Sequence, residues 1–348
     1  MVTSEATSVA PHRPVLPAGR AHAWATLGCL ALLLLLSLLS VALGTRWIPP
    51  DQVFTLLLHP DGSEVAGIVR QMRLPRTLFG LLVGAALAVA GALMQGLTRN
   101  PLADPGILGV TAGASVGIVL TTAVFGVVSV HGYVWFGLAG AVVATALVYG
   151  LGSAGRGGAT PAKLALAGAA VSALLQSLVN AALLVDAAAL GDFRFWAVGA
   201  LTGQPATTLG SILPFFAAGA LLAATTAPAL NTLALGEDIA RGFGQRVHLV
   251  RLRGAAAVTL LAGAAVALCG PIAFVGLVVP HVVRAFTGPD HRWILWYSAL
   301  LGPCLLLAAD IAGRLLTRPD ELPVGIVVTA LGAPFFVALV RRRGLREL

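Results

Sequence analysis

The chain has 348 residues, of which 58% are hydrophobic and only 10% are charged. A water-soluble domain carries about 25% charged residues, and a disordered chain is charged and poor in aliphatic residues, so both classes are excluded. The formal net charge of +8 accompanies long apolar blocks, which indicates a polytopic membrane protein and gives no support for nucleic-acid binding.

The apolar blocks predict an all-α protein, because helices satisfy their own backbone hydrogen bonds within lipid and no strand periodicity is present. We expect residues 1–23 to form a disordered cytoplasmic tail, followed by an uncleaved first span over 24–44. A turn at Ser129, His131 and Gly132 divides the long block 105–155 into two spans. The remaining blocks are 77–98, 164–185, 195–230 with its crossing at 211–230, 254–283, 293–309 and 324–340.

Positive charge sets the orientation of the spans. With the N-terminus in the cytoplasm, the inner segments hold about twice as many Arg and Lys residues as the outer ones. The basic segments 231–253, 284–292 and 341–348 should then all be cytoplasmic, so the chain must leave and return within 254–283. That block is too short for two helices of about 20 residues each, so one of them must be a half-span helix.

The break within this block is expected at Cys269-Gly270-Pro271, because proline cannot continue a helix cleanly. A short helix over about 272–284 would follow and end near Pro280-His281. The prediction is about ten transmembrane helices with both termini cytoplasmic, forming one transmembrane domain over 24–341 and a basic tail over 342–348. Since non-helical backbone at membrane depth must be enclosed, residues 268–276 should lie near a pathway or an internal interface.

Several short motifs occur in a fixed order along the chain. They are RLPR at 73–76, GALMQ at 91–95, NPLADPGILG at 100–109, LALGE at 233–237, GLVVPH at 276–281, ELPVG at 321–325 and LGAPFF at 331–336. Together they closely resemble the permease family of bacterial ABC importers for ferric siderophores, haem and vitamin B12, over nearly all of 24–343. The resemblance implies ten spans, in agreement with the charge argument.

The resemblance also implies the partners. They are a second permease subunit, identical or homologous, two P-loop ATPase subunits and an extracytoplasmic substrate-binding protein. The expected function is therefore that of the permease subunit of an ATP-driven importer in the cell membrane, surrounded by lipid. Ferric siderophores are the favoured cargo, cobalamin or haem the alternative, and a free-metal permease or a secondary transporter the less favoured readings.

Arg70, Arg73 and Arg76 cluster at the predicted outer mouth of the second span, against the positive-inside trend. They could snorkel to the interface, or they could dock acidic residues of a partner, because the arginine fork binds a carboxylate with two hydrogen bonds. In the resembling family, the RLPR arginines and one after an ADI motif pair with glutamates of the binding protein. Those positions here are Arg73, Arg76 and Arg314, although Asp310 four residues before Arg314 offers a local pair instead.

The segment 231–247 mixes apolar and charged residues and is divided by glycines. It could be an amphipathic helix on the cytoplasmic membrane surface. The resemblance favours a coupling helix that fits a groove on an ATPase. The residues expected to carry the coupling are Leu233, Leu235, Gly236, Glu237, Ala240 and Gly244.

The resemblance assigns the loop before the fifth span to a cytoplasmic gate, and small residues there, Ala159 and Thr160, suit a narrow constriction. It also turns the fifth span, 164–185, toward the central cavity. Gln176 and Asn180 lie four residues apart on one face of this span. Either an interhelical hydrogen bond or contact with the substrate would explain them.

The energy source should lie in other chains. The sequence has no GxxxxGK[ST] loop, so ATP and Mg²⁺ are expected on a partner ATPase, and this chain should be neither an enzyme nor a holder of a cofactor. His281 has no second ligand at helical spacing, so no metal site is expected. The mid-span stretches offer amides in place of ionisable groups, which argues against proton coupling.

Overall fold

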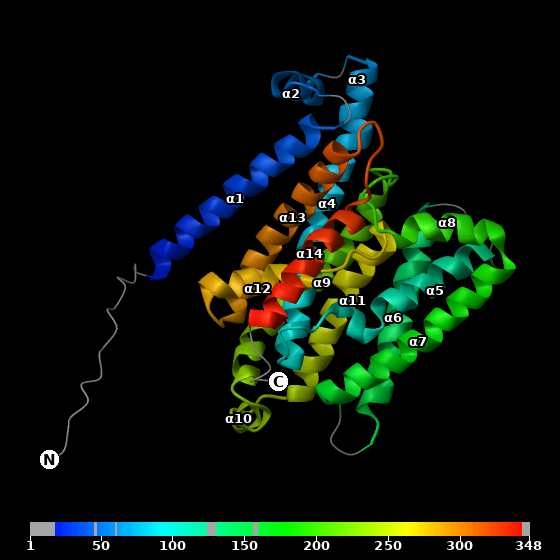
Figure 1. The fold of residues 1–348 in the computed structure, drawn as a ribbon. Helices are drawn as coiled ribbons and strands as arrows, with labels where there is room; N and C mark the ends of the chain where they lie inside the picture. The colour runs from blue at the N-terminus through cyan, green and yellow to red at the C-terminus, as the bar shows by residue number, and fades with distance from the viewer. Residues whose placement is uncertain (1–17, 45–46, 60, 124–129, 156–158, 343–348) are drawn as a thin grey trace.

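The computed structural model describes residues 18–44, 47–59, 61–123, 130–155 and 159–342, and every regular element in these ranges is helical (Figure 1). The spanning helices are α1 (Ala18–Ala42), α4 (Leu74–Thr98), α5 (Val110–Ala123), α6 (Val130–Ser153), α7 (Pro161–Val185), α9 (Thr208–Ala234), α11 (Val247–Cys269), α12 (Val275–Thr287), α13 (His291–Leu316) and α14 (Val324–Arg342). The connecting elements are α2 (Pro50–Leu58), α3 (Glu64–Gly67), a π-helix η1 (Ile68–Arg73), a 3₁₀ turn η2 (Pro105–Leu108), α8 (Ala187–Ala197) and α10 (Glu237–Gly242).

The predicted set of ten spans is confirmed. Within the described ranges, seven helices are long and apolar enough to cross a membrane, and α5, α12 and α14 are the shorter apolar helices that complete the set. Figure 1 shows α2, α3 and α8 at one end of the bundle, here the outer end, and α10 at the opposite, inner end. The start of α1 and the end of α14 both point toward the inner end.

Two boundaries differ from those expected. Helix α1 begins at Ala18, so residues 18–23 belong to the first helix, and residues 1–17 and 343–348 lie outside the described part of the chain. Helix α12 runs from Val275 past Pro280 to Thr287, where we expected an end near Pro280-His281. Pro280 cannot donate to the carbonyl of Gly276, but the Gln95 side chain on α4 donates to that oxygen at 3.1 Å. The helix therefore continues without an unsatisfied carbonyl at this turn.

Helix α4 lies at the centre of the bundle, where small residues let its neighbours come close. A Cβ atom on Gly84 would lie 2.6 Å from the Cα atom of Pro303 in α13, and one on Gly91 would lie 2.0 Å from the carbonyl oxygen of Gly276 in α12. Backbone therefore packs on backbone along this helix, as small residues allow in membrane helices. The periphery differs, since only 17% of the most apolar stretch of α1 is buried, against 78% for α11.

The start of the break between α11 and α12, at Leu268 to Gly270, is enclosed by protein, whereas Ala273 further along the break is exposed. Gly270 adopts a φ of 74°, and a Cβ there would lie 2.0 Å from the carbonyl oxygen of Trp196 in α8. The Ala200 amide donates to Cys269 O at 2.8 Å, and the Gln204 side chain donates to Leu268 O at 2.7 Å. The connection between α8 and α9 thus satisfies carbonyls that the end of α11 leaves free.

Candidate functional site

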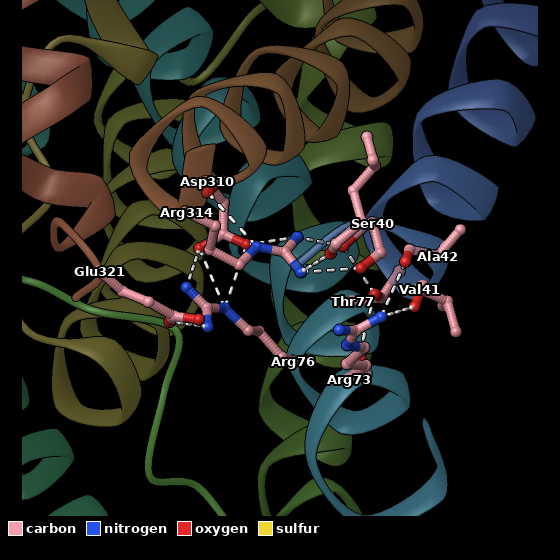
Figure 2. Close-up of polar contacts among 10 residues, drawn as sticks. Ser40, Val41, Ala42, Arg73, Arg76, Thr77, Asp310, Arg314 and Glu321 are labelled. Carbon is pink, nitrogen blue, oxygen red and sulfur yellow. Dashed lines mark hydrogen bonds and ion pairs between the residues drawn. The ribbon is translucent and has the colours of Figure 1, made fainter. Parts of the chain in front are cut away.

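The outer arginine cluster comprises Arg73, Arg76, Asp310, Arg314 and Glu321 (Figure 2). Arg73 ends the π-helical turn η1, and Arg76 follows Pro75 in the first turn of α4. A π-helical turn before a proline is a wide turn of the kind often found at functional sites. Asp310 and Arg314 lie on α13, and Glu321 lies between α13 and α14. The structure therefore brings the three predicted docking arginines together from two distant parts of the sequence.

Arg76 is held by two acidic side chains. Its Nε donates to both carboxylate oxygens of Asp310 at 3.1 Å, and its Nη2 donates to Oδ1 at 2.8 Å. Its Nη1 donates to Glu321. Asp310 is fully buried, whereas the side chain of Arg76 is 11% exposed and that of Glu321 is 32% exposed. A buried carboxylate needs such partners, and Arg76 supplies them to Asp310 across the gap between α4 and α13.

Arg73 and Arg314 cap the end of α1. Arg73 Nη1 donates to Val41 O at 2.9 Å and to Ala42 O at 2.8 Å, and Arg314 Nη1 donates to Ser40 O at 2.8 Å. The last turn of a helix leaves such carbonyls without helical partners, and its partial negative charge attracts cations. Figure 2 shows both guanidinium groups turned toward this turn. The two arginines therefore fasten the outer end of a helix that has little other packing.

Two of the three predicted docking arginines are buried. Arg73 is 7% exposed and Arg314 is 1% exposed. Arg314 also pairs with Asp310 at 3.0 Å, which is the local alternative that the sequence offered. A cavity of about 520 Å³ lies beside the cluster, lined by the three arginines, Glu321 and residues 201–205. A docking role for all three arginines stays a prediction, and Arg76 and Glu321 are the more accessible members.

Two members of this cluster, Asp310 and Glu321, were given no docking role from the sequence. Asp310 appeared only as a possible local partner of Arg314, and Glu321 only as part of the ELPVG motif. The sequence did hold one indication that Asp310 belongs to a polar cluster: it is an acidic residue within an apolar span, and such a group requires a partner. That signal did not indicate which of the arginines would supply it.

The coupling segment, residues 231–247, lies at the inner end. Helix α10 is set between Gly236, with a φ of 119°, and Gly244, with a φ of 77°. Glycine adopts these angles without strain, so both ends of α10 are suited to be hinges. Leu233 and Ala240 are buried and anchor the segment in the bundle.

The segment exposes apolar side chains beside its charged ones. Leu235 is 63% exposed, Ile239 50% and Phe243 75%. Leu235 ends α9, Ile239 lies within α10 and Phe243 follows it, so the three stand at a spacing of four residues along the segment. Ile239 and Phe243 were not among the predicted coupling residues, although this spacing in the sequence could have identified them. The six predicted residues therefore differ in position: Leu233 and Ala240 are buried, Gly236 and Gly244 border α10, Leu235 is exposed and Glu237 makes ion pairs. Their role in coupling stays a prediction.

Glu237 connects α10 to its neighbours. It accepts a hydrogen bond from Arg251 on α11, lies 4.0 Å from Arg99 at the end of α4, and accepts from Arg241 at 3.2 Å. The adjacent Asp238 pairs with Arg241, and its side chain is 99% exposed. One carboxylate therefore joins three elements, while its neighbour stays on the surface of α10.

A second polar contact at the inner end joins α9 to α13. The Asn231 amide donates to Asp290 at 2.7 Å, and its oxygen accepts from the His291 backbone N–H at 2.8 Å. Burial raises the pKa of the Asp290 carboxyl, but hydrogen bonds from Asn231 and from the Arg292 backbone, with the charges of Arg292 and His291, outweigh it and lower that pKa. Asp290 is thus kept charged beside the coupling segment.

The proposed gate and pathway residues lie at the start of α7 and along it, and Ala159 borders a cavity that the coupling segment also lines. Thr160 caps α7 by accepting from the Lys163 amide at 3.3 Å, Ala159 is buried, and residues 156–158 of the gate loop lie outside the described residues. Gln176 donates to Asn180 at 3.2 Å within α7, and both are exposed. This bond lies within one helix, not between helices as one alternative expected. Their roles in gating and transport stay predictions.

The chain is similar to known transport proteins over most of its length. The model of the FecCD transport family matches residues 32–342. The chain is 45% identical over 317 residues to the ferric enterobactin transport system permease protein FepD of Escherichia coli (strain K12), covering 91% of this chain and 94% of that protein. It is 43% identical over 320 residues to the iron(3+)-hydroxamate import system permease protein FhuB of Bacillus subtilis (strain 168), covering 91% and 83%.

The fold is also similar to a solved inward-facing structure of an ABC transporter of the metal-chelate type. The TM-score is 0.81 at 28% identity, and the match covers 92% of this chain and 99% of that chain. With its apolar spans, the chain is a multi-pass membrane protein of the permease type. It belongs to the FecCD transport family.

Proposed function

We propose that this chain is the permease subunit of an ATP-driven importer that takes up iron chelates, with ferric siderophores as its cargo. The observation that carries the proposal is the match of nearly the whole chain to the FecCD transport family, with relatives named for ferric enterobactin and iron(3+)-hydroxamate. Cobalamin and haem are the alternative cargoes. Two copies of the chain, or this chain and a homologous one, would enclose the pathway.

The inner end of the molecule would receive the force. An ATPase groove would enclose the exposed apolar side chains of Leu235, Ile239 and Phe243, since apolar surface left in water on a protruding segment favours a protein partner. Closure of two ATPase subunits on ATP would push α10 about its glycine hinges. The Glu237 contacts would pass this movement to α4 and α11, which are the most buried helices.

The outer end would receive the cargo. A binding protein would place a carboxylate in the cavity beside Arg76, in a mouth that already holds three arginines and two acidic residues. Arginine forks bind carboxylates in a fixed geometry, so the contact would set the orientation of the partner as well as its affinity. The chain itself would leave the chelate chemically unchanged.

Growth and uptake after deletion of this chain test the proposal. We expect cells lacking it to lose uptake of radiolabelled ferric siderophore and to regain it on re-expression, with cobalamin and haem uptake unchanged. Loss of cobalamin or haem uptake alone would reassign the cargo within the family. Uptake of every chelate at the wild-type rate, in cells without a second such permease, would refute the function.

A further inference from the structure

A basic crevice lies at the inner end, beside the coupling segment. It has a volume of about 490 Å³ and lies between the end of α6, the start of α7 and the coupling segment. Its lining includes Tyr149, Ala159, Arg241, Arg246, His248 and Arg251, and no acidic residue is among the described residues that line it. The crevice thus lies between Ala159, just before α7, and the coupling segment, and basic side chains line it. We propose that it binds a phosphate-bearing anion, either an acidic phospholipid headgroup or inorganic phosphate.

The first support is an incompletely satisfied buried cation. Arg251 is 7% exposed, and one of its terminal nitrogens donates to Glu237, but its Nε has no hydrogen-bond partner within the described chain. Native structures rarely leave a buried donor of this kind without an acceptor. An anion oxygen in the crevice would supply one.

The second support is the balance of charge. The nearest acidic groups, Glu237 and Asp238, are already bound to Arg241 and Arg251. Arg246 is exposed and makes no ion pair within the described residues. The crevice therefore keeps an uncompensated positive charge, which favours an anion with several oxygens over a single carboxylate.

The third support is the start of α11. This helix has 23 residues and begins at Val247, which lines the crevice. The amides of Val247 and Leu249 already donate to the Gln245 and Arg246 carbonyls, so this helix start contributes its partial positive charge to the crevice and not a set of free donors. The crevice is therefore lined by the start of this helix together with the buried Arg251 and the exposed Arg246.

Features near the crevice also suit a lipid headgroup. Tyr149 belongs to the residue types enriched where a membrane meets water. Leu151 and Leu252, on the two helices that border the crevice, are 60% and 44% exposed, and acyl chains would cover them. The buried oxygen of Gln245 has no donor in the described chain, and a headgroup hydroxyl would provide one. Basic pockets between helices on the cytoplasmic side are a recurrent form of headgroup site.

The test compares two exposed arginines. Arg246→Gln removes charge from the crevice, and Arg253→Gln removes it from the same region of α11 without touching the lining. The purified full chain is reconstituted in phosphatidylcholine with and without phosphatidylglycerol, and retained lipid is measured by native mass spectrometry. In detergent, the thermal shift produced by inorganic phosphate is measured separately.

We expect Arg246→Gln to weaken binding of the anion about fivefold, as one basic residue does near a membrane surface, and Arg253→Gln to leave it unchanged. Retention of phosphatidylglycerol identifies the lipid source, and a phosphate shift without lipid retention identifies free phosphate. Equal loss in both variants would mean general surface attraction and would overturn the site. No binding in either arm, or an effect of Arg246→Gln only on ATPase affinity, would overturn it as well. These binding readouts do not depend on transport, so they fail independently of the proposed function.

Discussion

The two ends of the bundle use arginine in opposite ways. At the outer end, Arg73, Arg76 and Arg314 are largely buried, and all three donate hydrogen bonds to α1 or to acidic side chains. At the inner end, Arg241 within α10 and Arg246 just after it are exposed, in a segment that presents apolar side chains to water. The outer group primarily holds helices together, whereas at the inner end Arg241 pairs with acidic residues of its own short helix and Arg246 lines the basic crevice. A sequence motif alone does not distinguish these two uses, because they depend on how deeply each arginine side chain is buried in the fold.

The comparison predicts the largest effect for Arg314→Gln. This change removes one of the two arginines that cap α1 and weakens the pairing of the buried Asp310, so the free energy of unfolding should fall by about 3–5 kcal/mol. Thermal unfolding in detergent measures the loss, with the exposed Arg70→Gln as the matched control. Equal, small shifts in both variants would mean that the outer cluster is not holding α1.

The next effect concerns coupling at the inner end. Glu237→Gln removes a charge-assisted contact with α11, worth about 1.5–3 kcal/mol, whereas Asp238→Asn affects only a surface pair within α10. We expect ATP-driven uptake to fall about tenfold in the first variant and to stay near the wild-type rate in the second. ATPase binding should be kept in both. A matching decrease in both variants would place the effect on the surface of α10 instead.

A smaller effect is expected from the exposed apolar side chains of the coupling segment. Phe243→Ala removes exposed apolar area without opening a cavity, so stability should not change, while the dissociation constant for the ATPase should rise about tenfold. Leu184→Ala, at an 88% exposed position near the C-terminal end of α7 and away from the coupling segment, is the control. Titration of labelled ATPase into the purified permease gives both constants. An unchanged affinity for the Phe243 variant would remove this side chain from the interface.

The smallest effect is expected from Arg76→Gln on binding-protein docking. Two acidic groups already hold Arg76, so its loss should weaken docking only about threefold, and more at low than at high salt because screening suppresses the contact. Surface plasmon resonance over a salt series measures this dependence. A loss that is the same at every salt concentration would indicate a change of shape and not the loss of a charge contact.

Sequence patterns predicted what depends on neighbours along the chain. The ten spans, the break at Cys269-Gly270-Pro271 and the glycines that border α10 follow from hydropathy, charge and residue type. The continuation of α12 past Pro280 could not be predicted, because it depends on Gln95, far away in the sequence. The capping of α1 by Arg73 and Arg314 depends equally on tertiary packing.

The central claim is that this chain is a pathway driven by separate ATPase subunits. Proteoliposomes containing the permease, its ATPase and external binding protein loaded with radiolabelled ferric siderophore test it directly. The account predicts accumulation that requires ATP on the ATPase side and stops when the ATPase cannot hydrolyse it, with no hydrolysis by the purified permease alone. Accumulation without the ATPase, or ATP hydrolysis by this chain alone, would contradict it.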